Sequence, residues 1–368
     1  MTEPDPGSAA RPDGDPAEPT RPATIYSVAE RAGVSIASVS RVLQGSTATS
    51  ARTRDKVLTA VRELEYLPQT AARSLAVRRS EAHGVVLGDL GGPYYSELML
   101  GYQSVAARHG QSVVLRLLGA ADNPQDAVRE LAGRVDGMTI AAPDVADDTV
   151  AALARSLPIV LVGRDPVAGC QNLTTENAHT AELLARHLID HGRRRLLFVG
   201  QPAGSHDVTG RYAGFRRAVE QAGLTEPGPL AVDQTEASGR AVVADHVERW
   251  TGADALVCAN DELALAIQDS LLRRGVRVPD DIAVVGWDDV RTARYVRPGL
   301  TTVAQPVHQL GELAAQWVHD RVAGDAAGPT ARVLPTRPVY RESCGCPEPA
   351  PTRAGPTSDG PPSAGTTA

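Results

Sequence analysis

The sequence predicts a chain of two parts, an all-α helix-turn-helix headpiece followed by an α/β core. Three short amphipathic segments fill residues 24–66, and a capping residue precedes each of them. Short apolar runs rich in Val, Ile and Leu then alternate with helix-like segments, which is typical of doubly wound parallel sheets. The charge divides in the same way. Residues 21–80 hold ten Arg or Lys against four acidic residues, a net charge of +6, whereas the whole chain carries −7.

Apolar residues at helical spacing mark the three headpiece helices. Gly33 stands between the first two and supplies the left-handed residue that ends a helix. Two helices joined by a short turn that contains Gly form the helix-turn-helix signature. The positions that we expect to be buried are Ile25, Val28, Ala29, Ala32, Val39, Val42, Leu43, Val57, Val61 and Leu64.

The polar face of the second helix carries side chains that suit DNA. In a helix-turn-helix, the N-terminal residues of this helix meet base edges in the major groove. Arg41 suits guanine, the hydroxyls of Ser38 and Ser40 suit phosphate, and Ile36 and Ala37 suit a thymine methyl. The alternative is a solvated helix face in an unrelated small bundle. The agreement of cap, turn, apolar spacing and positive charge favours DNA binding.

Residues 24–75 resemble the headpiece of the LacI/GalR family of bacterial transcription regulators. The matching stretches are TIYSVAERAGVS, VSRVLQGS, SARTRDKV and ELEYLPQTAARSL. The resemblance implies a hinge helix at about 69–76, with Leu75 wedged into the minor groove of a two-fold operator. Ser27 stands where the family usually has Asp, which we expect to weaken a local cap. The residues expected to contact DNA or support the contact are Tyr26, Ser35, Ile36, Ala37, Ser38, Ser40, Arg41, Gln44, Thr53, Tyr66, Gln69 and Leu75.

Seven apolar runs predict the strands of the core. They are too many for one small sheet, so we expect two similar subdomains with a cleft between them. Ligands of open parallel sheets bind beyond the carboxyl ends of the strands. The runs are GVVLGDL (84–90), SVVLRLL (112–118), GMTIAA (137–142), PIVLVG (158–163), RLLFVG (195–200), ALVCAN (255–260) and IAVVGW (282–287).

Polar and aromatic residues follow these strands. Arg, Asp, Asn and Gln side chains pair with vicinal hydroxyls and aromatic rings pack against the apolar face of a sugar, so the set predicts a polyol site. Capping of a helix by Asn260 and a turn at Asp288 are the structural alternatives. The candidate effector-binding residues are Tyr94, Tyr95, Arg164, Arg211, Asn260, Trp287, Asp288 and Gln305.

These positions are similar to the sugar-binding positions of the LacI/GalR core and of periplasmic sugar-binding proteins. The resemblance extends over about 24–345 and implies a periplasmic-binding-protein-like core, a homodimer and a sugar in the cleft. Three features depart from it: Gly92 replaces Asn, Gly163 replaces Asp, and Tyr94 with Tyr95 replaces the commoner Phe pair. A nucleoside or another small metabolite is therefore an open alternative to a sugar.

We expect a disordered tail (1–22), the headpiece (23–68), the hinge helix and linker (69–81), the core (82–345) and a second disordered tail (346–368). Within the core, the N-subdomain comprises about 82–175 and 305–330, and the C-subdomain about 176–304 and 331–345. No apolar run reaches the roughly 18 residues that cross a bilayer, and the N-terminus lacks a secretory signal. A cytoplasmic protein without a membrane partner is expected.

The sequence contains no Walker loop and no G-x-S-x-G elbow, so we expect no catalytic residues. Cys344 and Cys346 form a lone C-x-C without a second pair at zinc spacing, so no metal and no cofactor are expected. The predicted function is a DNA-binding transcription regulator, a repressor by resemblance. It would bind a palindromic double-stranded operator as a homodimer, under control of an effector, expected to be a sugar. The alternatives are a small-molecule receptor, a nucleoside-responsive regulator and an enzyme fused to a DNA-binding head.

Overall fold

The computed structural model describes residues 23–43, 46, 48–66, 80–119, 123–325 and 328–347. The chain divides between residues 78 and 79 into two compact units, the headpiece and the core, each with its own hydrophobic cluster or clusters. The predicted hinge helix and, apart from residues 346 and 347, both predicted tails lie outside the described residues. Among the described helices, none is both long and apolar enough to cross a membrane.

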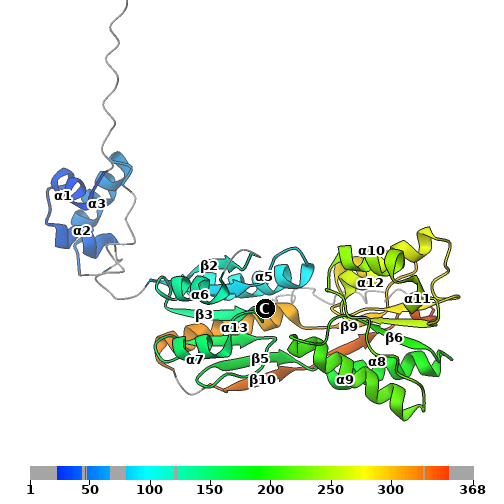
Figure 1. The fold of residues 1–368 in the computed structure, drawn as a ribbon. Coiled ribbons are helices and arrows are strands. Elements are labelled where there is room, and N and C mark those ends of the chain that lie inside the picture. The colour runs from blue at the N-terminus through cyan, green and yellow to red at the C-terminus, as the bar shows by residue number, and fades with distance from the viewer. Residues whose placement is uncertain are drawn as a thin grey trace, which may run out of the picture. The chain divides into compact units, whose positions relative to one another are not determined.

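The headpiece consists of α1 (Ile25–Ala32), α2 (Ile36–Leu43) and α3 (Ala51–Glu63) around one small core (Figure 1). All ten positions that the apolar spacing predicted belong to this cluster or pack against it. Gly33 has the left-handed φ of 65° that ends α1 and frees the chain to turn into α2. The helix-turn-helix prediction is thereby confirmed.

The cap of α1 differs from the expectation for Ser27. The Thr24 hydroxyl accepts the Ser27 backbone N–H at 3.3 Å, and the Ser27 hydroxyl accepts the Thr24 backbone N–H at 2.8 Å. This reciprocal pair is a capping box, which satisfies two backbone donors that the helix leaves unpaired. Ser27 therefore completes the cap.

The N-subdomain of the core is built on a six-stranded parallel sheet in the order β10-β5-β4-β3-β1-β2. Helices α5 (Pro93–Arg108) and α13 (Val307–Ala323) cover one face, and α6 (Pro124–Ala132) and α7 (Asp147–Leu153) cover the other. The strands are β1 (Ala82–Leu87), β2 (Ser112–Leu117), β3 (Gly137–Ala141), β4 (Ile159–Val162), β5 (Gln171–Thr175) and β10 (Ala331–Leu334).

The C-subdomain is built on a three-stranded parallel sheet in the order β6-β7-β8. Helices α8 (Ala178–Asp190) and α9 (His206–Gln221) cover one face, and α10 (Glu236–Asp245) and α12 (Asp261–Arg273) cover the other (Figure 1). The remaining elements are β6 (Leu196–Val199), β7 (Ala255–Cys258), β8 (Ala283–Val285), the antiparallel pair β9 (Thr302–Ala304) and β11 (Arg337–Val339), α11 (Val247–Trp250), and the short η1 (Arg291–Arg294) and η2 (Glu342–Cys344).

All seven predicted apolar runs overlap a strand, so two parallel-sheet subdomains are confirmed. The apolar runs did not predict β5, β9, β10 and β11. Strand β5 is buried along its length although its sequence is QNLTT. Strand β10 pairs with β5, so residues 331–334 belong to the N-subdomain and the last crossover falls after Leu334, not before residue 331 as we expected.

Two glycines allow α5 and α13 to pack backbone to backbone. A Cβ on Gly311 would lie 2.0 Å from the carbonyl oxygen of Leu98, and a Cβ on Gly101 would lie 2.0 Å from that of His308. These separations are far below van der Waals contact, so neither position accepts a side chain without a shift of a whole helix. The pair sets the distance between the two helices that cover one face of the N-subdomain sheet.

We therefore predict that Gly311→Ala lowers the free energy of unfolding of the core by about 1–3 kcal/mol, the usual cost of overpacking. Gly133→Ala is the matched control, because a Cβ there lies 3.6 Å from its nearest neighbour. Urea unfolding followed by circular dichroism measures both variants. Equal midpoints for Gly311→Ala and the unsubstituted protein would show that α5 and α13 are not held at this distance.

Candidate functional site

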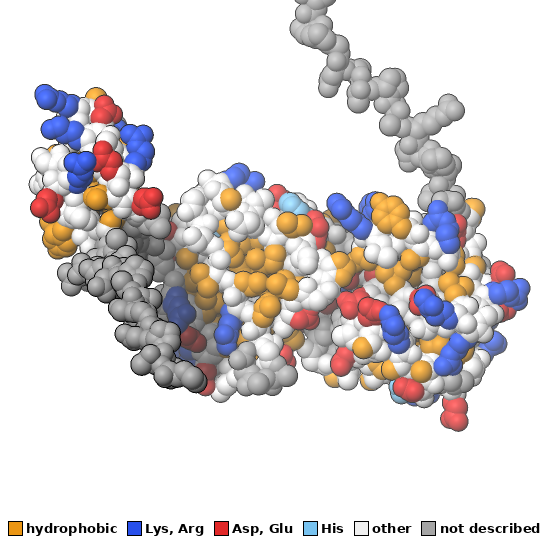
Figure 2. All heavy atoms as spheres, turned by 90° about the horizontal axis from the view of Figure 1, so that it is seen from above, with side chains coloured by type: hydrophobic (Ala, Val, Ile, Leu, Met, Phe, Trp, Pro, Cys, Tyr) orange, Lys and Arg blue, Asp and Glu red, His pale blue; other side chains and the backbone are white. Residues whose placement is uncertain are grey.

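Helix α2 of the headpiece turns its polar face to solvent. Ser35, Ile36, Ala37 and Arg41 are exposed, and Ser38 and Ser40 are half-buried. Val39 and Val42 fill the core below them. Figure 2 shows Lys and Arg side chains on the surface of the headpiece, which suits a polyanion.

The other candidate residues of the headpiece fall into four groups. Tyr26 is 68% exposed on α1, beside the start of the helix. Ser35 accepts the backbone N–H of Ser38 at 3.2 Å, and Thr53 donates its backbone N–H to Ser50 at 3.2 Å, so both lie at helix starts. Tyr66 is 8% exposed and packs in the headpiece core, which fits a supporting role. Gln44, Gln69 and Leu75 lie outside the described residues.

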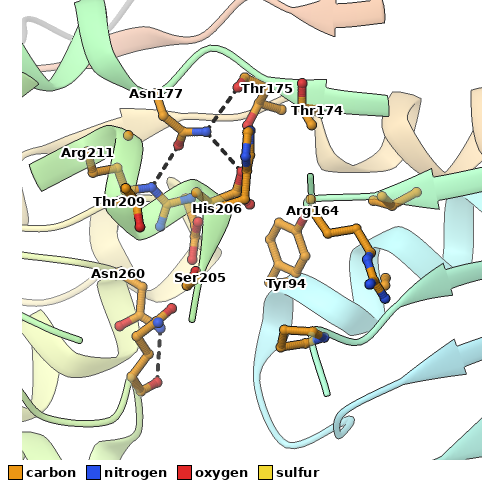
Figure 3. A pocket seen from close by; sticks show the side chains of 18 of the residues that line it. Tyr94, Arg164, Thr174, Thr175, Asn177, Ser205, His206, Thr209, Arg211 and Asn260 are labelled. Atoms are coloured by element: carbon orange, nitrogen blue, oxygen red, sulfur yellow. Dashed lines mark hydrogen bonds between the residues drawn. The ribbon is translucent and has the colours of Figure 1, made fainter. Parts of the chain in front are cut away.

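A cavity of about 1090 Å³ lies between the two subdomains of the core. One wall comes from the N-subdomain and includes the loop after β1, the start of α5 and the end of β4. The other wall comes from the C-subdomain and includes the starts of α9 and α12. Figure 3 shows Asn177, Arg211 and Asn260 on one side of this space and Tyr94 and Arg164 on the other. The cavity thus lies at the strand ends where the sequence placed a ligand.

Arg211 is held at the cavity by two hydrogen bonds and one aromatic ring. Its Nε donates to Asn177 Oδ1 at 2.9 Å, and one terminal nitrogen donates to the Ala259 carbonyl oxygen at 2.7 Å. Its guanidinium carbon lies 4.7 Å from the centre of the Trp287 ring, a cation–π contact. Among the described residues, the second terminal nitrogen has no hydrogen-bond partner. It is therefore the donor left for a ligand.

Two candidate residues lie behind the lining. Trp287 is 2% exposed and supports Arg211 from below, and neither it nor Gln305 is among the residues that line the cavity. Gln305 donates to Asp288 at 2.6 Å and accepts from the Thr175 hydroxyl at 2.7 Å. It therefore joins strand β5 of one subdomain to the Asp288 turn of the other.

The remaining candidates line the cavity but have other partners too. The terminal nitrogens of Arg164 donate to the carbonyl oxygens of Ala142 and Val145 and to Asp147, at 2.7–2.9 Å, which directs them into the N-subdomain. Asn260 caps α12 through the backbone N–H of Leu263, at 3.1 Å, as the structural alternative anticipated.

Tyr94 and Tyr95 form an edge-to-face pair with ring centres 5.2 Å apart. Burial raises the pKa of Tyr95 to about 12, so its hydroxyl keeps its proton at neutral pH. The two rings offer an apolar wall, and a protonated tyrosine hydroxyl can donate a hydrogen bond. Both features suit the pair to one face of a polyol.

Two glycines of the N-subdomain wall face carboxylates of the C-subdomain. A Cβ on Gly163 would lie 3.1 Å from Asp207 Oδ2, and a Cβ on Gly92 would lie 2.8 Å from Glu262 Oε2. These are the two positions where the sequence departs from the Asp and Asn common in sugar binders. The cleft therefore keeps oxygen acceptors at both places, supplied from the opposite wall.

Carboxylates dominate the charge of the cavity. Seven acidic residues line it, against two arginines, of which Arg164 is paired with Asp147. Burial raises the pKa of Asp207 and of Asp288, and the nearby Arg211 opposes both shifts. Asp261 lies deeper and fully buried, accepting hydrogen bonds from the Thr302 hydroxyl and the Val290 backbone. An anionic ligand would meet repulsion here, whereas hydroxyl donors would meet acceptors.

The sequence interpretation missed Asn177, Asp207 and Glu262. Asn177 follows strand β5, which the apolar pattern did not reveal. Asp207 precedes Arg211 by four residues on α9, so helical spacing alone would have placed the two on one face. Glu262 lies two residues after Asn260, in the first turn of α12. Its side chain reaches Gly92 only because the two subdomains face each other.

Comparison with known proteins relates both units of the chain to one family. The model of bacterial regulatory proteins of the lacI family matches residues 24–69, and that of the periplasmic binding protein-like domain matches residues 185–344. The HTH-type transcriptional repressor PurR of Photobacterium profundum is 32% identical over 307 residues, which cover 82% of this chain and 92% of the relative.

Two solved structures extend this likeness to the fold. A lac repressor dimer bound to operator and the anti-inducer ONPF has a TM-score of 0.77 at 27% identity, covering 88% of this chain and 99% of that one. The complex of the transcriptional regulator CelR with cellobiose has a TM-score of 0.65 at 30% identity, covering 87% and 99%. These relatives are regulators of transcription and not enzymes.

We predict that Gly163→Asp destabilises the core by about 1–3 kcal/mol through repulsion between two carboxylates in a partly buried cleft. Gly163→Asn is the control, since it adopts the same left-handed backbone, φ 65°, without the charge. Combining Gly163→Asp with Asp207→Asn should restore the free energy of unfolding to that of Gly163→Asn. Urea unfolding of the unsubstituted protein, Gly163→Asp, Asp207→Asn and the double variant measures the coupling, and additive effects would mean that the two positions do not meet.

Proposed function

Because this chain belongs to the LacI family of bacterial regulatory proteins, we propose that it is a transcriptional repressor whose operator binding is controlled by a neutral sugar in the core cleft. The chain is a DNA-binding regulator and not an enzyme. The proposal adds that it acts in the cytoplasm as a homodimer on a palindromic operator. The observation that carries the effector assignment is the acid-rich cavity around Arg211.

The headpiece supports major-groove recognition by α2. Ile36, Ala37 and Arg41 are exposed on the same helix, and the helix is fixed from below by buried Val39 and Val42. An Arg that pairs with a guanine contributes about 1–3 kcal/mol of discrimination against another base. We propose that Arg41 makes this contact and that Leu75 wedges into the minor groove between two half-sites.

The edge of the N-subdomain sheet supports a homodimer. Among the described strands, β2 has a neighbour on one side only, and its Leu115 and Leu117 are exposed. Leu100 on the adjoining α5 is 62% exposed. Figure 2 shows hydrophobic side chains gathered on this face of the core. An unpaired edge strand beside exposed leucines is a surface that a second copy would cover.

The cavity supports a neutral polyol as effector. Sugars carry many hydroxyl donors, and the cavity offers mostly acceptors, with Arg211 as the firmly held donor. The tyrosine pair adds one apolar wall. A solved relative, CelR, is in complex with cellobiose. A nucleoside has fewer hydroxyl donors than a sugar to pair with these acceptors, and its base needs an aromatic ring to stack on. It is therefore the second candidate. A phosphorylated sugar is disfavoured by the carboxylates.

We predict opposite effects for two arginine substitutions. Arg41→Ala should weaken binding to DNA upstream of the gene by about 5- to 150-fold and leave the response to effector intact. Arg211→Ala should keep operator affinity and abolish the shift that effector causes. Fluorescence anisotropy at several salt concentrations, with neutral sugars, sugar phosphates and nucleosides, measures both. Arg273→Ala, an exposed arginine on α12, is the control.

The outcomes of this experiment are distinct. Salt-dependent binding to a palindromic site, weakened or strengthened by one neutral sugar, supports the whole proposal. A shift by nucleosides alone keeps the regulator and replaces the effector class. Unchanged operator affinity of Arg41→Ala would contradict the assignment of α2. Leu75→Ala, measured in the same way, should also weaken operator binding and leave effector binding intact. Unchanged operator affinity of this variant would contradict the wedge.

We also predict that Leu115→Glu, with Leu117→Glu, shifts the protein from dimer to monomer, since two charges would be buried in the dimer interface. Analytical ultracentrifugation measures the mass in solution. Leu272→Glu, at an exposed leucine of the C-subdomain, is the control. A dimer that survives both β2 substitutions would mean that the interface lies elsewhere.

A further inference from the structure

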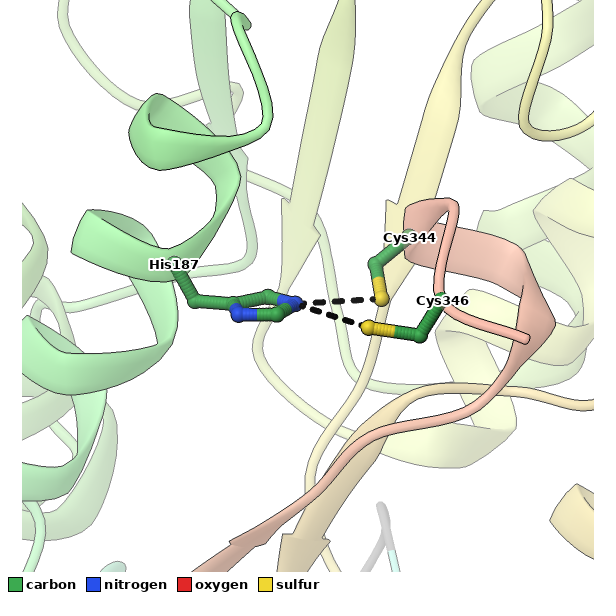
Figure 4. Close-up of side chains that lie close together, drawn as sticks. All are labelled: His187, Cys344 and Cys346. Carbon is green, nitrogen blue, oxygen red and sulfur yellow. Dashed lines mark hydrogen bonds between the residues drawn. The ribbon is translucent and has the colours of Figure 1, made fainter. Parts of the chain in front are cut away.

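A cluster of soft metal ligands lies far from the cleft, on the C-subdomain. The Nε2 atom of His187 lies 3.3 Å from Cys344 Sγ and 3.4 Å from Cys346 Sγ. His191 lies one turn further along the chain at the end of α8, with its Nε2 3.7 Å from Cys346 Sγ. Figure 4 shows the His187 ring pointing at both thiols from the opposite side of the cluster.

We propose that His187, His191, Cys344 and Cys346 bind a zinc ion. Zinc in structural sites takes four Cys or His ligands in a tetrahedron, with bonds of about 2.3 Å to sulfur and about 2.0–2.1 Å to nitrogen. These bonds place a nitrogen and a sulfur about 3.6 Å apart. Three of the four nitrogen–sulfur distances fall close to this value, and His191, which lies outside the tight group of the other three ligands, is the fourth and more distant ligand.

The backbone conformation at Gly345 brings the thiols of Cys344 and Cys346 together. Gly345 has a φ of 105°, a left-handed conformation that favours glycine and ends η2. If the helical turn of η2 continued, side chains two residues apart would point to opposite sides. All three ligand atoms of His187, Cys344 and Cys346 lie within 4.8 Å of one another. Glycine at this position therefore serves the convergence of the cluster.

The His187 ring is held in place by its neighbours. It stacks on the Tyr340 ring with centres 4.0 Å apart and lies 4.3 Å from the centre of the His191 ring. A ring fixed in this way loses little freedom when it binds a metal. The alternative is a hydrogen-bonded cluster without metal, in which Cys344 donates its S–H to the Arg341 carbonyl oxygen at 3.1 Å. The two states differ in metal content and in the protonation of the thiols.

Charge and burial favour the ion. Cys344 is fully buried and packs in the hydrophobic cluster of the C-subdomain. Zinc would displace one proton from each thiol, and two thiolates with two neutral imidazoles around Zn²⁺ make a neutral complex. A neutral complex can be buried without the cost of an unpaired charge. The ion would fasten η2, at the end of the described chain, to the end of α8.

The C-x-C alone predicted no metal site, because His187 lies 157 residues before Cys344 in the sequence. The fold brings the two segments together where α8 packs beside the end of the core. Neither cysteine takes part in the proposed DNA or effector contacts, so the site is independent of those assignments.

The test uses the full-length protein, purified without chelators and loaded with zinc chloride. Elemental analysis should find one zinc per chain. Cobalt loading should give the absorption of tetrahedral thiolate coordination.

Cys170→Ser is the matched control, because Cys170 is a free thiol outside the cluster and should change neither result. Cys346→Ser and His187→Gln should weaken zinc binding at least tenfold, and His191→Gln should weaken it less.

Circular dichroism establishes that each variant is folded, and thermal unfolding with and without a chelator gives a second readout. The chelator should lower the melting temperature of the Cys170→Ser protein and leave that of Cys346→Ser unchanged. Any of three results would overturn the proposal: zinc-loaded protein without stoichiometric metal, cobalt absorption without thiolate character, or a Cys344–Cys346 disulfide in protein purified under reducing conditions.

Discussion

The placement of one guanidinium, that of Arg211, is the constraint on which the geometry of the cleft depends. The group is held in an acid-rich cavity by the Ala259 carbonyl oxygen, by Asn177 and by the Trp287 ring. These three partners follow strands β7, β5 and β8. The position of the guanidinium therefore depends on how the strands of both sheets are aligned. Without the cation, the desolvated carboxylates of Asp207 and Asp288 would lose the main positive charge beside them, which is costly in a medium of low polarity.

The same network reaches the segments that join the subdomains. Gln305 holds both the Thr175 hydroxyl, at the end of β5, and Asp288, and it lies in the crossover between β9 and α13. A ligand that engages Arg211 and Asp288 would therefore act on the two strands at the crossover. The free energy by which it can influence the headpiece equals its difference in affinity for two arrangements of these segments, usually about 1–3 kcal/mol.

The apolar pattern predicted the headpiece core and seven apolar strands, of which six are buried and β2 lies at the edge of its sheet. It failed for β5, whose buried side chains are mostly Gln, Asn and Thr and which hydrogen bonds stabilise, such as that from Gln171 to the Pro329 carbonyl oxygen. It also failed where residues from distant segments meet. Arg211 and Asn260 were found because they follow strands, whereas Glu262 beside Gly92 and His187 beside Cys344 depend on the tertiary fold.

The two glycines of the N-subdomain wall change how a ligand would be held. Because Asp207 and Glu262 fill the space beside Gly163 and Gly92, most charged contacts come from the C-subdomain. The N-subdomain contributes Tyr94 and Tyr95, while Arg164 is turned toward its own subdomain. A ligand would thus meet Arg211, Asp207, Glu262 and Asp288 on one wall and the two tyrosine rings with their hydroxyls on the other. Affinity would then depend on closure of the cleft, which is the property a ligand needs to shift a conformational equilibrium.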